Sequence, residues 1–516
     1  MKVPIAGSLM LLVIASAALG QQASAINANS SESQLSEAVR QLRAEIEQLQ
    51  NSVAELRTEA DRYRAQTQEL ERRLEAISPT SSAPSVQAMP QASGAQAEPG
   101  QDSSASASAR LAKLEDEYSL LTGKVDDQYQ TKVESGSRYR VRLSGLVMLN
   151  MFSNRGVPDS IDNPGVAIPS YGLYGTGSVA GTLRQSQMGI EIFGPEWAGA
   201  RVSGDLRFDF AGGFPDTDNG AVLGLMRLRT GNVRMNWSHT SITAGQNAPM
   251  FSAISPTSLI ALAQPEFAYT GNLWTWVPQL QVQHWIDLGN SQRLNFSAGI
   301  LDPLTGESPR GQFYRAAGAG ELSRQPGYSA RIGWSGGRDE DHPASFDLGG
   351  YFSRQNWGFN RIVDGWAGTA DWQIPLVDQL SLKGEFFRGQ ALGGFGASSG
   401  QSVVYSDVLQ NPLAIVRGLD DVGGWSQLSL QATPTLQFNA GYGVDNPFSK
   451  EIRQFAAQRN VLYPGLGRNS TAMSNVIYRP RSDLLFSLEY RHIVSSRLTN
   501  ARASADNIGM GIGLLF

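Results

Sequence analysis

The chain has 516 residues, a formal net charge of −5 and no cysteine. The lack of cysteine excludes disulfides, cysteine-ligated zinc, iron–sulfur clusters and thiol catalysis, and the acidic balance gives no sign of a basic nucleic-acid-binding domain. Charged residues make up 17% of the chain, and glycine occurs 55 times. Light charge with abundant glycine and scattered aromatic residues favours strands and turns over helices.

The amino terminus has the features of an export signal. Lys2 supplies a positive charge, residues 5–19 form an apolar run, and the small residues 23–25 offer a cleavage site. We predict that residues 1–25 are a signal peptide cleaved after Ala25. The alternative, an uncleaved anchor, is disfavoured because the run is too short to cross a bilayer.

A heptad pattern follows the signal. Leucine dominates its d positions, and the a positions are mostly apolar, with β-branched residues at Val39, Ile46 and Val53. This predicts a self-associating coiled coil over residues 33–77, since a lone amphipathic helix would have no core to lie on. The heptads alone leave the choice between two and three strands open. Residues 78–107 are rich in Ser, Ala, Pro, Gln and Gly and predict a flexible linker, and a second heptad-like pattern predicts a short helix over 108–135.

From residue 138 to the end, the hydrophobic period changes to two. The last strand shows it most clearly, because Ile508, Met510, Ile512, Leu514 and Phe516 alternate with glycines and Leu515. One face of such a strand is apolar, and lipid is an obvious partner for it. About sixteen such strands predict an all-β transmembrane barrel over 138–516, since closure is what pairs every backbone group in lipid.

Short and long connections alternate between these strands. We expect the short turns at one end of the barrel and the long loops at the other. Aromatic residues near strand ends or on outward faces are expected to form girdles at the lipid boundary: Trp274, Trp276, Trp285, Trp334, Trp366, Trp372 and Tyr490. The long connections are predicted at 153–178, 211–223, 247–273, 302–326, 389–422, 445–469 and 493–505.

Several short motifs, together with the coiled coil, resemble a family of Gram-negative porins. They are Leu-Arg-Gln-Ser at 183–186, Gly-Asp-Leu-Arg-Phe-Asp-Phe at 204–210, Leu-Arg at 228–229, Gly-Gln at 245–246 and Pro-Gln-Leu-Gln at 278–281. The chain resembles the DcaP-like trimeric porins, which are related to the phosphate-selective porins. The resemblance implies a homotrimer of sixteen-stranded barrels that passes small, often anionic, solutes. Gln187 and Met188 stand where the family often has arginine, so the solute preference stays open.

Strand parity predicts which charged side chains line a water-filled channel, and the basic ones are in excess. The competing interpretation is that these charges pair across neighbouring strands and merely keep the wall hydrated. The candidate pore-lining residues are Arg140, Arg142, Arg201, Asp205, Arg207, Asp209, Arg227, Arg229, Arg331, Lys383, Glu385, Glu489 and Arg491. The third long connection, 247–273, is the best candidate for a segment that narrows the pore, because its apolar residues suit packing against the wall better than open water.

The sequence contains no convincing catalytic, cofactor-binding or metal-binding constellation, so we expect no enzyme. The leading hypothesis is an outer-membrane porin for passive diffusion of small hydrophilic, anionic solutes, with the coiled coil in the periplasm. The alternative is a structural protein that tethers the envelope through that coil. Expected partners are two further copies, outer-membrane lipid, the barrel assembly machinery (with Phe516 as the assembly signal) and peptidoglycan, and no nucleic acid.

Overall fold

The computed structural model describes residues 132–133, 139–170, 176–213, 224–289, 291–307, 315–337, 343–455, 466–498 and 501–516. The predicted signal peptide, coiled coil and linker lie outside these residues, as does nearly all of the predicted short helix. Within its range, 108–135, the described pair Lys132–Val133 forms a strand, β1, rather than a helix. Among the described residues, no helix has the length and apolar character needed to cross a bilayer.

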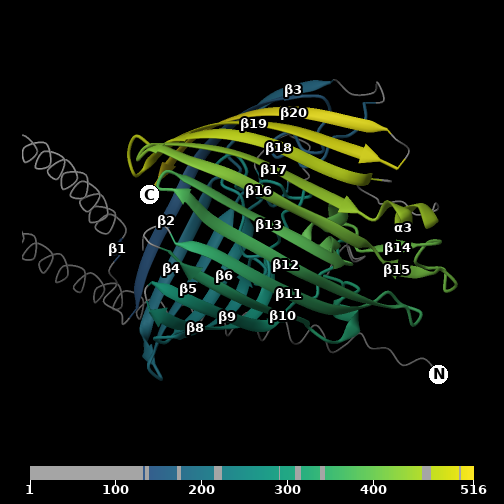
Figure 1. The fold of residues 1–516 in the computed structure, drawn as a ribbon, viewed down its shortest axis with the longest axis horizontal. Coiled ribbons are helices and arrows are strands. Elements are labelled where there is room, and N and C mark those ends of the chain that lie inside the picture. Colours follow the sequence, from purple (N-terminus) through teal and green to yellow (C-terminus); the bar gives the residue numbers. More distant parts are fainter. Residues whose placement is uncertain are drawn as a thin grey trace, which may run out of the picture. The chain divides into compact units, whose positions relative to one another are not determined.

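The described chain is built mainly of strands joined into one antiparallel sheet (Figure 1). Its other elements are four short helical turns and a small hairpin, all in the connections: η1 (Glu321–Ser323), η2 (Gly393–Phe395), η3 (Ala397–Gly400), α3 (Ser449–Gln454), and β14 (Val403–Tyr405) with β15 (Val416–Gly418). The long strands are β2 (Arg140–Arg155), β3 (Gly177–Thr182), β4 (Gln187–Trp197), β5 (Ala200–Asp209), β6 (Arg227–Asn236), β7 (Thr240–Asn247), β8 (Val277–Gly289), β9 (Gln292–Leu301), β10 (Gly327–Gly336), β11 (Ala344–Asn356), β12 (Ile362–Val377), β13 (Leu380–Gln390), β16 (Asp420–Thr433), β17 (Leu436–Pro447), β18 (Leu466–Tyr478), β19 (Leu484–Arg497) and β20 (Arg502–Leu515).

The sheet closes on itself. It contains 18 described strands, but β1 is only a two-residue addition to β2, and β3 and β4 pair with successive halves of β2 and share one position. Sixteen positions therefore go around the barrel, and β20 pairs with β2 from Leu146 to Arg155 to complete the ring. The prediction of a closed antiparallel barrel of about sixteen strands is confirmed.

Alternate residues of each strand face opposite sides of the wall, as the pleat requires. On β20, Ile508, Met510, Ile512 and Leu514 are exposed on the outer face, whereas Asn507 on the inner face is buried. The same division continues along the ladder, where Tyr490 pairs with Ile508 outside and Glu489 pairs with Gly509 inside. An apolar exterior and a polar interior are the reverse of a soluble domain and are typical of a barrel in lipid.

The connections are unequal at the two ends of the barrel. Short turns join β4 to β5, β12 to β13 and β16 to β17, and longer segments join β2 to β3, β5 to β6, β7 to β8 and β13 to β16. One predicted long loop is wrong, because β19 continues to Arg497 and β20 begins at Arg502. Strand pairing over Ile493–Ala505 was missed because the serines and arginines of this stretch look like a loop in sequence.

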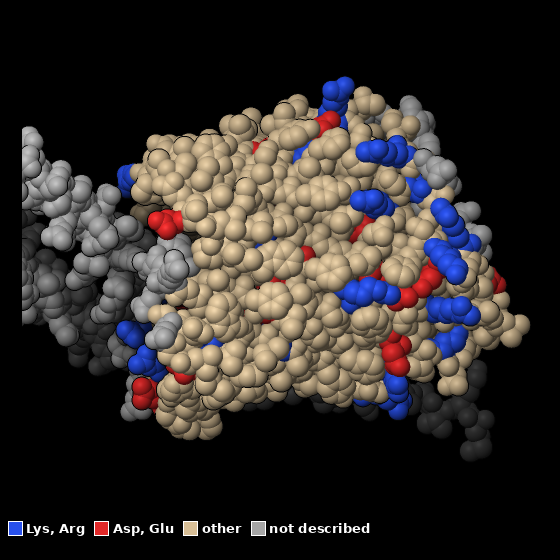
Figure 2. All heavy atoms as spheres, viewed as in Figure 1, with Lys and Arg blue, Asp and Glu red and all other residues tan. Residues whose placement is uncertain are grey.

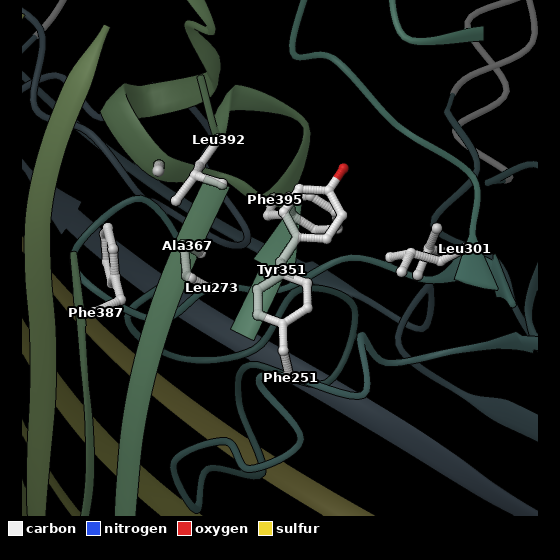
Figure 3. Packing of buried hydrophobic residues seen from close by; sticks show 10 residues of the cluster. Phe251, Leu273, Leu301, Tyr351, Ala367, Phe387, Leu392 and Phe395 are labelled. Carbon is white, nitrogen blue, oxygen red and sulfur yellow. The ribbon is translucent and has the colours of Figure 1, made fainter. Parts of the chain in front are cut away.

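Two of the long connections fold into the barrel and build an apolar core there. Phe251 and Leu273 from the β7–β8 connection meet Phe395 from the β13–β16 connection and Tyr351 on the inner face of β11. The ring centroids of Phe251 and Tyr351 stack 5.0 Å apart, and Phe395 meets both rings edge-on (Figure 3). This core fills part of the interior and fixes the position of the β7–β8 connection.

Candidate functional site

The segment 248–276, which joins β7 to β8, crosses the barrel interior and contacts strands far from its own. The Thr257 carbonyl accepts hydrogen bonds from Gln427 on β16 (2.9 Å) and Asn475 on β18 (3.0 Å). Ser258 donates to Glu489 on β19 (2.5 Å). We call residues 248–276 the inner loop. It is held by side chains from several parts of the wall and does not extend into solvent.

A buried ion-pair cluster anchors the middle of the inner loop. Arg491 on β19 lies 2.8 Å from Glu266 of the loop and 2.7 Å from Glu489 beside it, and all three side chains are at most 2% exposed. Arg491 also donates to Asn163 in the β2–β3 connection (3.1 Å). Glu489 and Arg491 share the predicted inner face, but here they hold two connections against the wall and do not face open space.

A second group of predicted residues anchors the start of the loop. Lys383 donates to the Ser255 carbonyl (3.0 Å) and the Thr257 hydroxyl (2.7 Å), and Glu385 accepts from Ser252 (2.7 Å). Arg331 on β10 lies 2.7 Å from Asp371 and 3.3 Å from Asp347. Lys383, Glu385 and Arg331 also lie on the inner face. The inner loop covers Lys383 and Glu385, and Asp371 and Asp347 neutralise Arg331.

The glycines on the inner face of β20 make room for the loop. A Cβ added at Gly509 would lie 2.6 Å from the Ile260 Cγ2 atom, and one at Gly511 would lie 2.9 Å from Ile260 Cδ1. Ile260 itself is 1% exposed. The alternation of glycine with large apolar residues in the last strand thus has two causes, lipid on one side and the inner loop on the other.

Substituting Gly509→Val is expected to lower the free energy of unfolding by about 1–3 kcal/mol, because overpacking forces the Ile260 side chain to move. The thermal unfolding of the detergent-solubilised protein measures this effect. Combining Gly509→Val with Ile260→Ala should recover most of the loss. If the double variant is destabilised by the sum of the two single effects, the two side chains do not compete for one space.

Charged residues on β5 and β6, in another part of the wall, form a partly neutralised cluster. The buried Asp209 lies 2.6 Å from Arg227 and 3.6 Å from Arg229, and Arg227 also donates to the Ala263 carbonyl of the inner loop (2.7 Å). Both guanidinium groups lie over the ring of Trp276, at 4.7 and 4.9 Å. Two cations thus share one carboxylate where the loop approaches the wall, leaving an excess positive charge.

Further arginines extend along this wall without being covered. We call Arg140, Arg142, Arg201, Arg207 and Arg234 the basic wall; the cross-strand register places them on the inner face of β2, β5 and β6. Arg140, Arg142, Arg201 and Arg207 are exposed, and Arg234 is half-buried, with a side chain that is 39% exposed. Arg207 lies 3.6 Å from Glu191, and Arg234 lies 2.8 Å from the buried Asp205. The predicted charges therefore separate into a set that the inner loop covers and an accessible, mainly basic set on β2 and β5.

Three residues of this arrangement were missed from sequence. Arg234 was missed because a bulge beside Arg229 shifts the parity of β6; its signal is the apolar alternation of Val233 and Met235. Trp276 was assigned to a lipid girdle, but it lies against Arg227 and Arg229 inside. Gln185, whose side chain bonds both the carbonyl of Ile260 (2.7 Å) and the amide of Leu262 (2.7 Å), sits where the strand breaks between β3 and β4, and no sequence signal identified its role.

Other aromatic residues divide between the two faces. Trp334, Trp366 and Trp372 share the outer parity of their strands, as expected for a girdle. Trp285 pairs with Asn295 on the inner face, whereas Ile286 and Leu294 pair outside. The girdle prediction is therefore wrong for Trp285 and for the inner-loop residues Trp274 and Trp276. At the end of a strand and in a loop, the sequence alone does not determine which side of the wall a side chain faces.

Burial raises the pKa of Glu266 to about 8, against the attraction of Arg491 and with a further contribution from Glu489. A carboxyl whose pKa is raised on folding stabilises the fold fully below its ordinary pKa and loses that contribution as pH rises through the raised value. We expect the thermal unfolding temperature to fall between about pH 5 and pH 8, and Glu266→Gln to flatten this dependence. An unchanged slope in the Gln variant would assign the dependence to other groups.

No group of three or more potential metal ligands of the His, Cys, Asp or Glu type occurs among the described residues. The fold of the barrel is similar to that of outer-membrane channels of solved structure. The outer-membrane channel DcaP of Acinetobacter baumannii matches with 16% identity and a TM-score of 0.56, over 75% of this chain and 100% of that chain.

Two further solved structures match more distantly. The anion-selective porin from Comamonas acidovorans has 10% identity and a TM-score of 0.44, over 73% of this chain and 100% of its own. OprB of Pseudomonas putida has 12% identity and a TM-score of 0.41, over 73% and 94%. The chain matches no protein-family model and no curated protein sequence. The resemblance expected from sequence is confirmed at the level of the DcaP barrel fold.

Proposed function

We propose that the protein is an outer-membrane porin through which small hydrophilic, anionic solutes diffuse passively. The observation that carries the proposal is the pairing of an apolar outer face with an inner wall that carries exposed arginines, in a barrel whose interior a loop crosses. A barrel of sixteen strands is wide enough to enclose an aqueous channel. Solutes would pass between the inner loop and the basic wall, where positive charge raises the local concentration of anions.

The pairing of charges supports the anion preference more strongly than a count of all inner charges does. Asp209 is fully buried and Asp205 is 8% exposed, so both carboxylates lie behind the arginines that they bind. Arg207, by contrast, has a 57% exposed side chain. Glu191 and Glu196 are the carboxylates of β4 near this wall, and they are outnumbered by the five arginines of the basic wall.

Conductance of the purified protein in a planar bilayer tests the proposal. We expect stable steps of open-channel current and, in a salt gradient, a reversal potential of the sign that indicates anion preference. A cation-selective reversal potential would refute the anionic solute class but keep the channel. Insertion without current would favour the envelope-tethering alternative.

Assembly and location are further parts of the proposal. We propose export through residues 1–25, a homotrimer, and a periplasmic coiled coil at 33–77 joined to the barrel by the 78–107 linker. Deleting residues 26–107 should leave the conductance of each barrel unchanged, and the mass of the assembly in detergent reports whether the coil is needed for association.

A further inference from the structure

The outer face of the barrel carries a groove along β16. The row of outward residues on β16 is small at its centre, where Gly424 and Ser426 lie between larger neighbours. Phe386 and Trp372 form one side of the groove, and Tyr442 and Val444 form the other. Its volume is about 490 Å³. An apolar groove of this shape on the outer wall fits an extended hydrocarbon chain, which gains dispersion contacts on three sides.

Arg468 lines one end of the groove, together with Asn446. The register of the ladder places Arg468 opposite Ser496, and Ser496 opposite Arg502, so the three residues form one row across β18, β19 and β20. The parity that sends Ile508 outward sends Arg502 outward too. With strands about 4.8 Å apart, the two arginine backbones lie about 10 Å apart with a hydroxyl between them.

These two arginines differ from other outward arginines near the strand ends. Arg354 lies 2.8 Å from Asp364, and Arg388 lies 3.1 Å from Asp420. Within the part of the chain that the structure describes, no carboxylate lies within ion-pair distance of Arg468 or Arg502, and both residues are exposed. Figure 2 shows Lys and Arg, with Asp and Glu among them, gathered at the end of the barrel that carries α3, β14 and β15, beyond a broad uncharged band.

We propose that this surface is a binding site for a phosphate-bearing acyl lipid of the surrounding membrane. The phosphate lies between Arg468, Ser496 and Arg502, and one acyl chain lies in the β16 groove. Guanidinium groups bind phosphate through charge-assisted hydrogen bonds that are stronger than neutral ones. The site faces away from the interior, so it is independent of the solute pathway proposed above.

The position of the groove favours a lipid over a free anion or a second protein. A free phosphate ion has no apolar part that could fill the groove that ends at the arginines. A second copy of the barrel would have to place carboxylates opposite Arg468 and Arg502 and fill the groove with a protruding side chain. A membrane lipid brings both required parts, a charged head and an apolar tail, at the depth where the wall changes from uncharged to charged.

The test measures lipid binding by native mass spectrometry of the full-length protein in detergent, with diphosphoryl lipid A as the probe. The Arg468→Gln/Arg502→Gln variant should bind at least tenfold less lipid than the native protein. Ser426→Leu, which fills the groove and keeps both arginines, should also reduce binding. The matched control, Arg354→Gln/Asp364→Asn, removes an arginine that already has a partner and should leave binding unchanged.

Two further arms separate the alternatives. Inorganic phosphate in excess should not displace the lipid, and displacement would mean that an anion site without lipid specificity lies there, which overturns the proposal. Unchanged lipid binding by the double arginine variant would also overturn it. A variant that loses subunit association while still binding lipid would assign the surface to protein contact instead. Bilayer conductance, measured on the same variants, should stay native, so failure of the lipid site is distinguishable from failure of the channel.

Discussion

Replacing Arg491 by Met is expected to release the inner loop and raise the single-channel conductance. Arg491 is the shared cation for Glu266 and Glu489, and all three side chains are nearly fully buried. Removing one partner of a buried ion pair leaves uncompensated charge and costs about 3–5 kcal/mol. The inner loop, which contains Glu266, has less regular structure than β19, which contains Glu489. We therefore expect the loop to move before the strands separate.

Two measurements follow the Arg491→Met change. Bilayer recordings should show larger and noisier current steps, and thermal unfolding in detergent should begin at a lower temperature. A triple variant, Arg491→Met with Glu266→Gln and Glu489→Gln, removes the orphaned charges and should return both readouts most of the way to native. A larger conductance in the triple variant than in the single variant would show that hydrogen bonding by these carboxylates, rather than charge balance, holds the loop.

Reversing two charges of the basic wall, Arg142→Glu/Arg207→Glu, is expected to lower the anion-to-cation permeability ratio by about tenfold or more. A unit charge acts on an ion about 4 Å away with about 1 kcal/mol in water, and with more where the wall excludes solvent. Each substitution changes the local charge by two units. Neither arginine supports a buried carboxylate, since the Glu191 partner of Arg207 is itself 26% exposed, so the fold should survive.

Reversal potentials in a salt gradient measure this ratio, and the effect should shrink at high ionic strength because salt screens exposed charges. The control is Arg481→Glu, the same charge change in an exposed turn between β18 and β19, which should leave the ratio native. An unchanged ratio in the double variant would place the selective charges elsewhere, and the arginine pair beside Trp276 would be the next group to replace.

Strand parity predicted the faces of the wall, because a period of two is a property of each strand by itself. Whether an inner side chain is exposed to the interior or buried under the inner loop was not predictable in the same way. Arg207 and Arg491 have the same residue type and the same parity, yet one has a 57% exposed side chain and the other 2%. The difference arises from where the inner loop crosses the interior, and that path depends on contacts between residues hundreds of positions apart.

Local irregularities account for the remaining errors. The bulge beside Arg229 brings Arg234 inside, and the break between β3 and β4 turns Gln185 towards the inner loop. Neither feature follows from propensity, since a one-residue shift reverses every later assignment in a strand. The glycines of β20 are the one sequence signal of how the inner loop packs against the wall. The sequence alone does not show that the side chain they accommodate is Ile260.

The seam between β2 and β20 has a consequence for how the barrel forms. The Gly145 amide donates to the Phe516 carbonyl (2.8 Å), and the Phe516 amide donates to the Gly145 carbonyl (3.1 Å). The first and last long strands must therefore find each other after everything between them has been made. Until then, both strands have unpaired edges that can recruit other chains. Since contacts so distant in sequence form slowly, we expect the unclosed polypeptide to aggregate unless another protein covers these edges or speeds their pairing.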